Sequence, residues 1–194
     1  MGEKLDLDLI FQVCVVVSDA KAVVKNWIDN FNIDESKIIH RNLKEMYDAG
    51  NYHCGNYNEN PCEYYHELYR LEVGGIDFEI IEPISKEPGN PYTDFLFENG
   101  GNGIHHLGVK FRDRDKAVNK FKEMGIPVYT YAYQGKPTDS GTLKDCYFYD
   151  LRKLLGVIFE CGSAVVGPLA NDPRANNPKD FDDSKYTSTP VKLD

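Results

Sequence analysis

The sequence predicts an α+β fold built from two tandem βαβββ modules that form one curved mixed sheet. Two observations carry this prediction. Runs rich in β-branched and aromatic residues alternate with single helical stripes of apolar residues, and the order strand, helix and three strands occurs twice. A chain of 194 residues with 41% hydrophobic content can bury one compact core, but it is too short for separate large domains.

The first module begins with an apolar strand at residues 10–17. Ser18 and Asp19, both N-cap residue types, lead from this strand into a helix. Residues 36–68 are rich in Asn, Gly and Tyr, and they predict strand fragments and a long loop. Two strands joined at Gly74 and Gly75 then form a hairpin that ends at Pro83.

The second module repeats this order after a short helix at residues 92–100. A strand from His106 runs to Asp113 and is followed by a helix with Gly125 as its C-cap candidate. Three further candidate strands occupy residues 128–133, 144–150 and 154–161. The sequence therefore defines one domain over residues 8–162, with modules at about 8–84 and 102–162. Residues 163–194 form a polar C-terminal tail, which we expect to be disordered or to lie over a partner subunit or the mouth of a site.

Polar residues coincide when the two modules are superposed. Gln12 falls on His106 and Asp19 on Asp113, and Glu79 in the last strand of the first module falls on Glu160. Any two amphipathic strand and helix units share an apolar pattern, but the match of polar residues favours a true repeat.

The charge and cysteine content restrict the function classes. A net charge of -9 and a pI near 5.0 disfavour nucleic acid or an anionic membrane surface as the partner. The sequence contains no apolar run of transmembrane length and starts with a segment too charged for a secretory signal, so we expect a cytoplasmic protein. Five scattered cysteines predict reduced thiols, and Cys14 and Cys161 lie in apolar strands where a cysteine acts as a small hydrophobe.

Two pairs of polar residues predict a metal site. Gln12 and His106 lie early in the first strand of each module, and Glu79 and Glu160 lie inside apolar last strands. Burial of an unpaired carboxylate is costly, so these glutamates indicate a wet, paired or metal-bound face. If the two halves of the sheet curve toward one another, the four side chains converge, and they suit a divalent ion such as Zn, Ni, Co or Mn.

The double histidine resolves into two unequal positions. Neighbouring residues of a strand face opposite sides of the sheet, so at most one of His105 and His106 can face this site. The repeat selects His106, and we expect His105 on the opposite face in a packing or hydrogen-bonding role. His40, His53 and His66 have no ligand spacing, and we expect them in surface or packing roles.

Residues 8–162 resemble the vicinal oxygen chelate superfamily, which includes glyoxalase I, methylmalonyl-CoA epimerase, extradiol dioxygenases and bleomycin-resistance proteins. The stretches that carry the resemblance are "FEIIEPIS", "FLFENGGNGIHHLGVKFRD" and "GVIFEC". The resemblance implies that Gln12, Glu79, His106 and Glu160 bind the metal and that Glu160 also removes the substrate proton. An epimerase needs a second base, and Glu63 is favoured over Glu67 and Glu72, although an exposed loop carboxylate explains Glu63 equally well.

The resemblance implies a divalent-metal-dependent isomerase, epimerase or lyase. Such an enzyme abstracts a proton next to a metal-polarised carbonyl and passes through an enolate or enediolate. The implied partners are a small-molecule carbonyl or thioester substrate and a second copy of the chain in a homodimer. One alternative is a non-catalytic binding or resistance protein on the same fold. Another is a ring-cleaving dioxygenase, which Gln12 disfavours because it replaces one histidine of the required triad.

Overall fold

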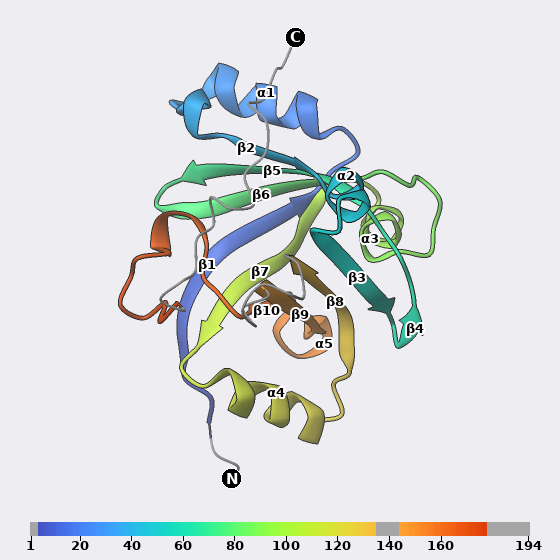
Figure 1. Cartoon of the computed structure of the whole chain (residues 1–194), viewed down its shortest axis with the longest axis vertical. Helices are drawn as coiled ribbons and strands as arrows, with labels where there is room; N and C mark the ends of the chain where they lie inside the picture. Colours follow the sequence, from blue (N-terminus) through green and yellow to red (C-terminus); the bar gives the residue numbers. More distant parts are fainter. Residues whose placement is uncertain (1–3, 135–143, 178–194) are drawn as a thin grey trace.

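A curled mixed sheet dominates the computed structural model, which describes residues 4–134 and 144–177. The sheet has 10 strands within these ranges and forms a half-barrel (Figure 1). The strands are β1 (Leu7–Val16), β2 (Ile39–Asn42), β3 (Tyr52–Tyr57), β4 (Asn60–Pro61), β5 (His66–Val73), β6 (Ile76–Pro83), β7 (Gly103–Phe111), β8 (Val128–Gln134), β9 (Lys144–Asp150) and β10 (Ile158–Gly162). The helices are α1 (Ala20–Asn30), α2 (Leu43–Asp48), α3 (Pro91–Asn99), α4 (Arg114–Glu123) and α5 (Arg152–Leu155), with 3₁₀ turns η1 (Glu35–Lys37) and η2 (Gly167–Leu169).

The strand order confirms the predicted repeat of two βαβββ units. The sheet runs β2-β5-β6-β1-β7-β10-β9-β8-β3-β4. In the first unit β6 pairs in parallel with β1, and in the second unit β10 pairs in parallel with β7. Antiparallel pairing of β1 with β7 joins the units, so the first strands of both modules lie together at the centre of the sheet.

The two helices that follow these central strands begin in the same way. Asp19 accepts a hydrogen bond from the amide of Ala22 at 2.9 Å, and Asp113 accepts one from the amide of Lys116 at 2.9 Å. Both aspartates are therefore N-caps, as the superposition of the modules predicts.

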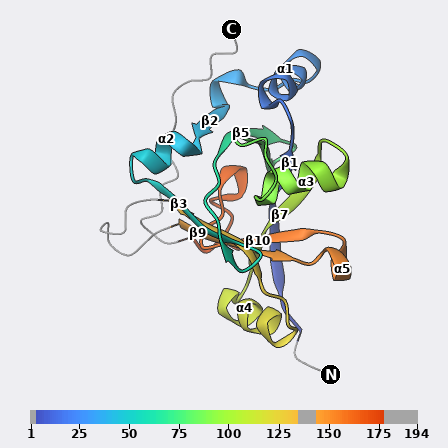
Figure 2. The same ribbon diagram turned by 90° about the vertical axis from the view of Figure 1, so that its right-hand side faces the viewer.

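The irregular region of the first module forms an insertion between β2 and β5. It contains α2, β3 and β4, and β3 pairs with β8 of the second module. Figure 2 shows β3 beside the strands of the second module. A segment of one module thus extends the sheet of the other.

Two helices cover the outer face of the half-barrel. Val24 of α1 packs with Tyr69 and Ile80, and Phe121 of α4 packs with Tyr149. Figure 1 shows the two helices at opposite ends of the molecule. Because side chains alternate along a strand, the neighbours of these outward residues point to the concave face.

The last strand is shorter than predicted. Residues 154–161 were expected as one strand, but Leu154 and Leu155 belong to α5 and are exposed. Gly156 has a φ of 79°, in the left-handed region, and ends this helical turn. The strand β10 therefore begins only at Ile158.

The described part of the C-terminal tail packs onto the sheet. Val165 and Val166 are buried against Leu9 and Phe11 of β1, and η2 contacts β1 and β6. Residues 163–177 are thus ordered against their own chain rather than disordered, and residues 178–194 lie outside the described residues. No helix in the described ranges has both the length and the apolarity that a membrane crossing requires.

Candidate metal centre

The four predicted metal ligands meet on the concave face of the sheet. They come from four neighbouring strands: Glu79 from β6, Gln12 from β1, His106 from β7 and Glu160 from β10. In the strand register, Gly108 lies opposite Gln12 on one side and opposite Glu160 on the other. Residues that pair in this way share a face, so the register alone places these side chains together.

Short distances link the four side chains. Nε2 of His106 lies 3.0 Å from a carboxylate oxygen of Glu160 and 3.5 Å from one of Glu79. Nε2 of Gln12 lies 3.4 Å from the other oxygen of Glu79. All four residues are at most 7% exposed, so the cluster is shielded from bulk water.

Glycine at position 108 leaves the room that this cluster needs. A Cβ atom on Gly108 would lie 2.7 Å from Cβ of Gln12 and 3.0 Å from its Oε1. Both separations are shorter than ordinary carbon contacts. A larger residue would therefore displace Gln12 from the site.

A buried ion pair orients the Gln12 amide. Nε2 of Gln12 donates to Oδ2 of Asp77 at 2.7 Å, and Nε of Arg70 donates to both Asp77 oxygens at 2.9 and 3.0 Å. An ionised carboxylate only accepts hydrogen bonds, so the amide nitrogen must face Asp77. Oε1 of Gln12 therefore faces elsewhere, and it is buried without a hydrogen-bond partner among the described residues. Burial raises the pKa of Asp77, an effect that the positive charge of Arg70 opposes.

Asp77 and Arg70 were not predicted as site residues. Asp77 precedes Glu79 by two positions and so lies on the same face of β6. The argument applied to Glu79, that a carboxylate inside an apolar strand indicates a polar face, would have identified Asp77 as well.

His105 does not face the opposite side of the sheet, and that prediction is wrong. In the pairing of β1 with β7, Cys14 lies opposite His106 and Val15 lies opposite Ile104, so His105 is an extra residue in a β-bulge. A bulge interrupts the alternation of side chains. His105 is buried beside Tyr92, and its Nδ1 lies 2.9 Å from Nδ1 of His106.

The two histidine rings face each other through their Nδ1 atoms. Burial lowers the pKa of His105 well below its ordinary value, so that ring is neutral, and one of the two Nδ1 atoms donates a hydrogen bond to the other. Nε2 of His106 is then the nitrogen that faces the two carboxylates. Burial alone would lower the pKa of His106, but Glu160 and Glu79 outweigh it and raise that pKa to about 9.

The donor set fits a divalent metal ion. Among the described residues, Oε1 of Gln12 and Nε2 of His106 are buried atoms without a well-aligned hydrogen bond, and the carboxylates of Glu79 and Glu160 lie next to Nε2 of His106. Orphaned buried polar atoms are rare in native proteins and indicate an unseen ion or water. One imidazole nitrogen, one amide oxygen and two carboxylates suit Zn, Ni, Co or Mn.

Cys14 is a further polar group in the same place. The residue is fully buried, and its Sγ lies with a carboxylate oxygen of Glu79 and a ring nitrogen of His106 in a group whose atoms are all within 4.8 Å of one another. Burial and the Glu79 carboxylate raise the pKa of the Cys14 thiol well above its usual value. The apolar strand pattern around Cys14 predicted only a small hydrophobic residue at this position.

Comparison with known families identifies the fold. Residues 11–143 match the model of the Glyoxalase/Bleomycin resistance protein/Dioxygenase superfamily. The chain belongs to this superfamily. Comparison with curated proteins found no match.

Solved structures with this fold include a methylmalonyl-CoA epimerase variant from Streptomyces coelicolor in complex with 2-nitronate-propionyl-CoA. It is 15% identical with a TM-score of 0.50, and the match covers 84% of this chain and 100% of that chain. A hypothetical protein from Bacillus halodurans is 20% identical with a TM-score of 0.49, over 82% of this chain and 92% of that one. Methylmalonyl-CoA epimerase from Mycobacterium tuberculosis is 15% identical with a TM-score of 0.46, and the match covers 81% of this chain and 85% of that chain. The first of these likenesses supports the glyoxalase-like fold.

The structure does not bring Glu63 to the four clustered ligands. Glu63 is exposed between β4 and β5, and its carboxylate accepts hydrogen bonds from Tyr47 at 3.2 Å and Tyr65 at 2.9 Å. Of the two other candidates for a second base, Glu67 bonds His40 at 2.6 Å and Glu72 is exposed on β5.

His66 takes a packing role, one of the two roles expected for it. Its ring is 4% exposed and lies beside the rings of Tyr52, Tyr64 and Tyr92. Burial lowers the pKa of His66 to about 4, so the ring is neutral at physiological pH.

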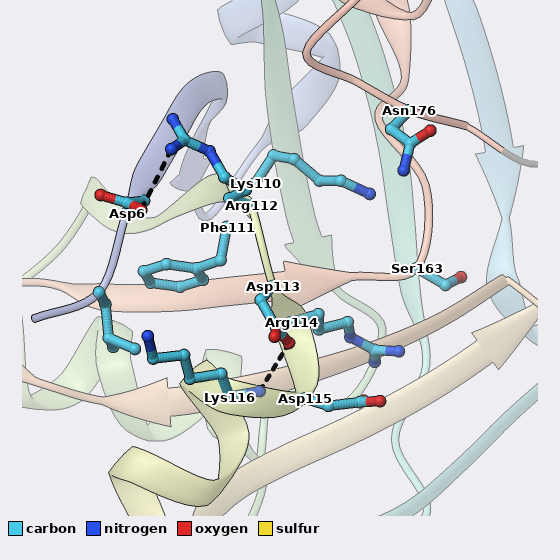
Figure 3. A pocket seen from close by; sticks show the side chains of 11 residues that line it. Asp6, Lys110, Phe111, Arg112, Asp113, Arg114, Asp115, Lys116, Ser163 and Asn176 are labelled. Atoms are coloured by element: carbon cyan, nitrogen blue, oxygen red, sulfur yellow. Dashed lines mark hydrogen bonds and ion pairs between the residues drawn. The ribbon is translucent and has the colours of Figure 1, made fainter. Parts of the chain in front are cut away.

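A separate cavity of about 640 Å³ lies at the end of β7 and the start of α4 (Figure 3). Its lining is charged and includes Lys110, Arg112 and Arg114. The predicted ligands Gln12, Glu79, His106 and Glu160 are not among its lining residues. Arg112 is paired with Asp6 at 3.2 Å, as the figure shows, so part of the positive lining is neutralised. This cavity is therefore separate from the cluster of the four predicted ligands.

Proposed function

We propose that this protein is a divalent-metal-dependent isomerase, epimerase or lyase that moves a proton next to a carbonyl group. One observation carries the proposal: Oε1 of Gln12 and Nε2 of His106 are buried without a well-aligned hydrogen bond among the described residues, and Nε2 of His106 lies 3.0 Å from Glu160 and 3.5 Å from Glu79. A structural polar cluster would satisfy these atoms internally. The substrate class that we propose is a small-molecule carbonyl compound or thioester.

An ion held by Gln12, Glu79, His106 and Glu160 would polarise the substrate carbonyl and stabilise the negative charge that develops on its oxygen. We assign the proton transfer to Glu160, which is a carboxylate in the middle of β10. It accepts the proton from the carbon next to the carbonyl and then returns it. Asp77 holds the amide of Gln12 and His105 holds the ring of His106, which fixes both side chains before substrate arrives.

The choice between the members of this enzyme class depends on a second base. An epimerase needs one on the other face of the planar intermediate, whereas an isomerase or lyase can use Glu160 alone. We retain Glu63 as the proposed second base of the epimerase version. Its carboxylate is held by two tyrosine hydroxyls, so it would have to leave them to reach a substrate.

Solvent deuterium exchange tests the proposal. The metal-loaded protein is incubated in D₂O with a panel of acyl-CoA thioesters and hemithioacetals, because a fold neighbour binds an acyl-CoA compound. We expect deuterium at the carbon next to the carbonyl of at least one substrate, and a rate that Glu160→Gln lowers by roughly a hundredfold to ten-thousandfold.

Two outcomes would contradict parts of this proposal. Absence of exchange with every substrate, together with tight ligand binding by metal-free protein, would favour a non-catalytic binding protein of the same superfamily. If Glu63→Gln leaves exchange and epimerisation at the native rate, Glu63 is not the second base.

A further inference from the structure

We infer that the thiol of Cys14 is a fifth donor to the same ion, so that the centre contains sulfur as well as nitrogen and oxygen. This inference rests on the proposed function, since it requires an ion between Glu79 and His106. The residue lies two positions after Gln12 in β1 and so on the same face of that strand.

The register places Cys14 in the middle of the ligand row. It pairs with Glu79 of β6 on one side and with His106 of β7 on the other. Side chains of paired residues project side by side from a sheet, so Sγ lies between the two ligands. The resulting group of one sulfur, one oxygen and one nitrogen spans no more than 4.8 Å, which is compact enough for one ion.

The polar surroundings distinguish Cys14 from an ordinary buried cysteine. Cys161, in β10, packs with Phe111 and Phe159 in an apolar cluster that faces α4. Cys14 also contacts apolar residues, including Val16, but its neighbours across the sheet are a carboxylate and an imidazole. Both residues are buried, and only Cys14 has metal-binding side chains on both flanking strands.

A sulfur donor would narrow the choice of metal. Thiolate is a soft ligand that favours Zn, Co and Ni over Mn and Mg, which prefer oxygen. The thiol proton leaves to the buffer when the metal–sulfur bond forms, because cysteine binds metals as the thiolate. We therefore expect affinity for Co(II) to fall at least about tenfold in Cys14→Ser, while affinity for Mn(II) changes much less.

Titration of the metal-free full-length protein with Co(II) tests this inference. Cobalt bound by thiolate gives an intense near-ultraviolet charge-transfer band, whereas cobalt bound by nitrogen and oxygen gives only weak visible bands. We expect the charge-transfer band in the native protein and in the matched control Cys161→Ser. The variant Cys14→Ser should bind cobalt with visible bands and without the charge-transfer band.

The possible failures are distinguishable. Cobalt binding with visible bands alone in the native protein would overturn the role of Cys14 and leave the proposed function intact. Absence of cobalt binding would overturn both. If Cys14→Ser does not fold, X-ray absorption of the native zinc-loaded protein decides, because a zinc–sulfur distance of about 2.3 Å is expected only if Cys14 binds.

Discussion

Gln12 depends on a buried ion pair for its orientation. Asp77 accepts hydrogen bonds from both Gln12 and Arg70, and both charged residues are 3% exposed. A buried pair of this kind contributes little net stability, but loss of one partner leaves an uncompensated charge. On the concave face this pair fixes the Gln12 amide nitrogen toward Asp77, which leaves the amide oxygen for the proposed ion.

Substitution of Asp77 tests its contribution to protein stability and its role in orienting the Gln12 amide. We expect Asp77→Asn to destabilise the protein by about 3 kcal/mol, because the buried guanidinium of Arg70 loses the carboxylate that accepts the hydrogen bond from its Nε. Metal affinity should also fall, by roughly tenfold to a hundredfold, because the Gln12 amide is no longer held by a charged acceptor. Chemical denaturation and metal titration measure the two effects.

The double variant Arg70→Met/Asp77→Leu is the control. Removal of both charges should restore much of the stability and leave metal affinity low. Recovery of metal affinity together with stability would show that Asp77 has no orienting role.

The charge on His106 makes the stability of the metal-free protein depend on pH. Its pKa is raised to about 9 from an ordinary value of 6.5, since Glu160 and Glu79 favour the imidazolium. A raised pKa contributes stability that is complete below pH 6.5 and is lost as the pH rises through 9. We therefore expect the unfolding free energy of metal-free protein to fall across this range, and the fall to be absent in His106→Gln. A flat or rising profile in the native metal-free protein would contradict this assignment.

Strand β7 contributes two local features that shape the site. A bulge brings His105 alongside His106, and Gly108 leaves space for Gln12 on the next strand. The bulge gives His106 a hydrogen-bond partner, and Gly108 leaves room for Gln12, so that neighbouring strands can present the proposed ligands side by side.

Substitution of Gly108 tests the second feature. We expect Gly108→Ala to cost about 1–3 kcal/mol of stability, because its Cβ would overlap Gln12. Metal affinity should fall at least about tenfold as Gln12 is displaced. Gly103→Ala in the same strand is the matched control, because its Cβ would meet Asn99 rather than a ligand. Equal losses of metal affinity in the two variants would contradict a specific role for Gly108.

Much of the sheet could be predicted because the two modules carry polar residues at equivalent positions. The match of Gln12 with His106 identified the two central strands, and Glu79 and Glu160 marked the last strand of each module. The bulge at His105 could not be predicted, because it depends on the pairing of β7 with β1 and not on the local sequence. The pairing of β3 with β8 is likewise a contact between distant segments that no local pattern encodes.

The sequence predicted the four side chains that cluster on the concave face, but it did not predict Asp77, Arg70 and Cys14 around them. Cys14 resembled a core residue because its own strand is apolar, and only the strand register places it between Glu79 and His106. Glu63 was chosen as a second base from its position in the sequence alone. It lies in an irregular segment, where the spacing of residues does not determine which way a side chain points.

The C-terminal segment packs against β1 and β6 of the first module. Val165 and Val166 cover Leu9 and Phe11, and a Cβ on Gly167 would lie 2.7 Å from Cβ of Asp77. The C-terminal segment therefore packs next to the ion pair that orients Gln12.

Truncation tests the contribution of this segment. We expect a chain that ends at Gly162 to lose at least about 3 kcal/mol of stability relative to a chain that ends at Asn177, because two buried valines are removed and two apolar residues of β1 become exposed. Metal affinity should fall as well, because removal of the segment exposes Asp77, which holds the amide of Gln12. Thermal unfolding and metal titration of the two chains provide the measurement, and equal values would show that the segment has no such role.

Metal content tests the central claim most directly. After metal-free protein is dialysed against zinc or cobalt, elemental analysis should find one ion per chain in the native protein. A double variant, Gln12→Ala/His106→Ala, should hold almost none while Glu63→Gln retains the native content. Native protein without a stoichiometric ion, or full metal content in the double variant, would contradict the proposal that these strands carry a metal centre.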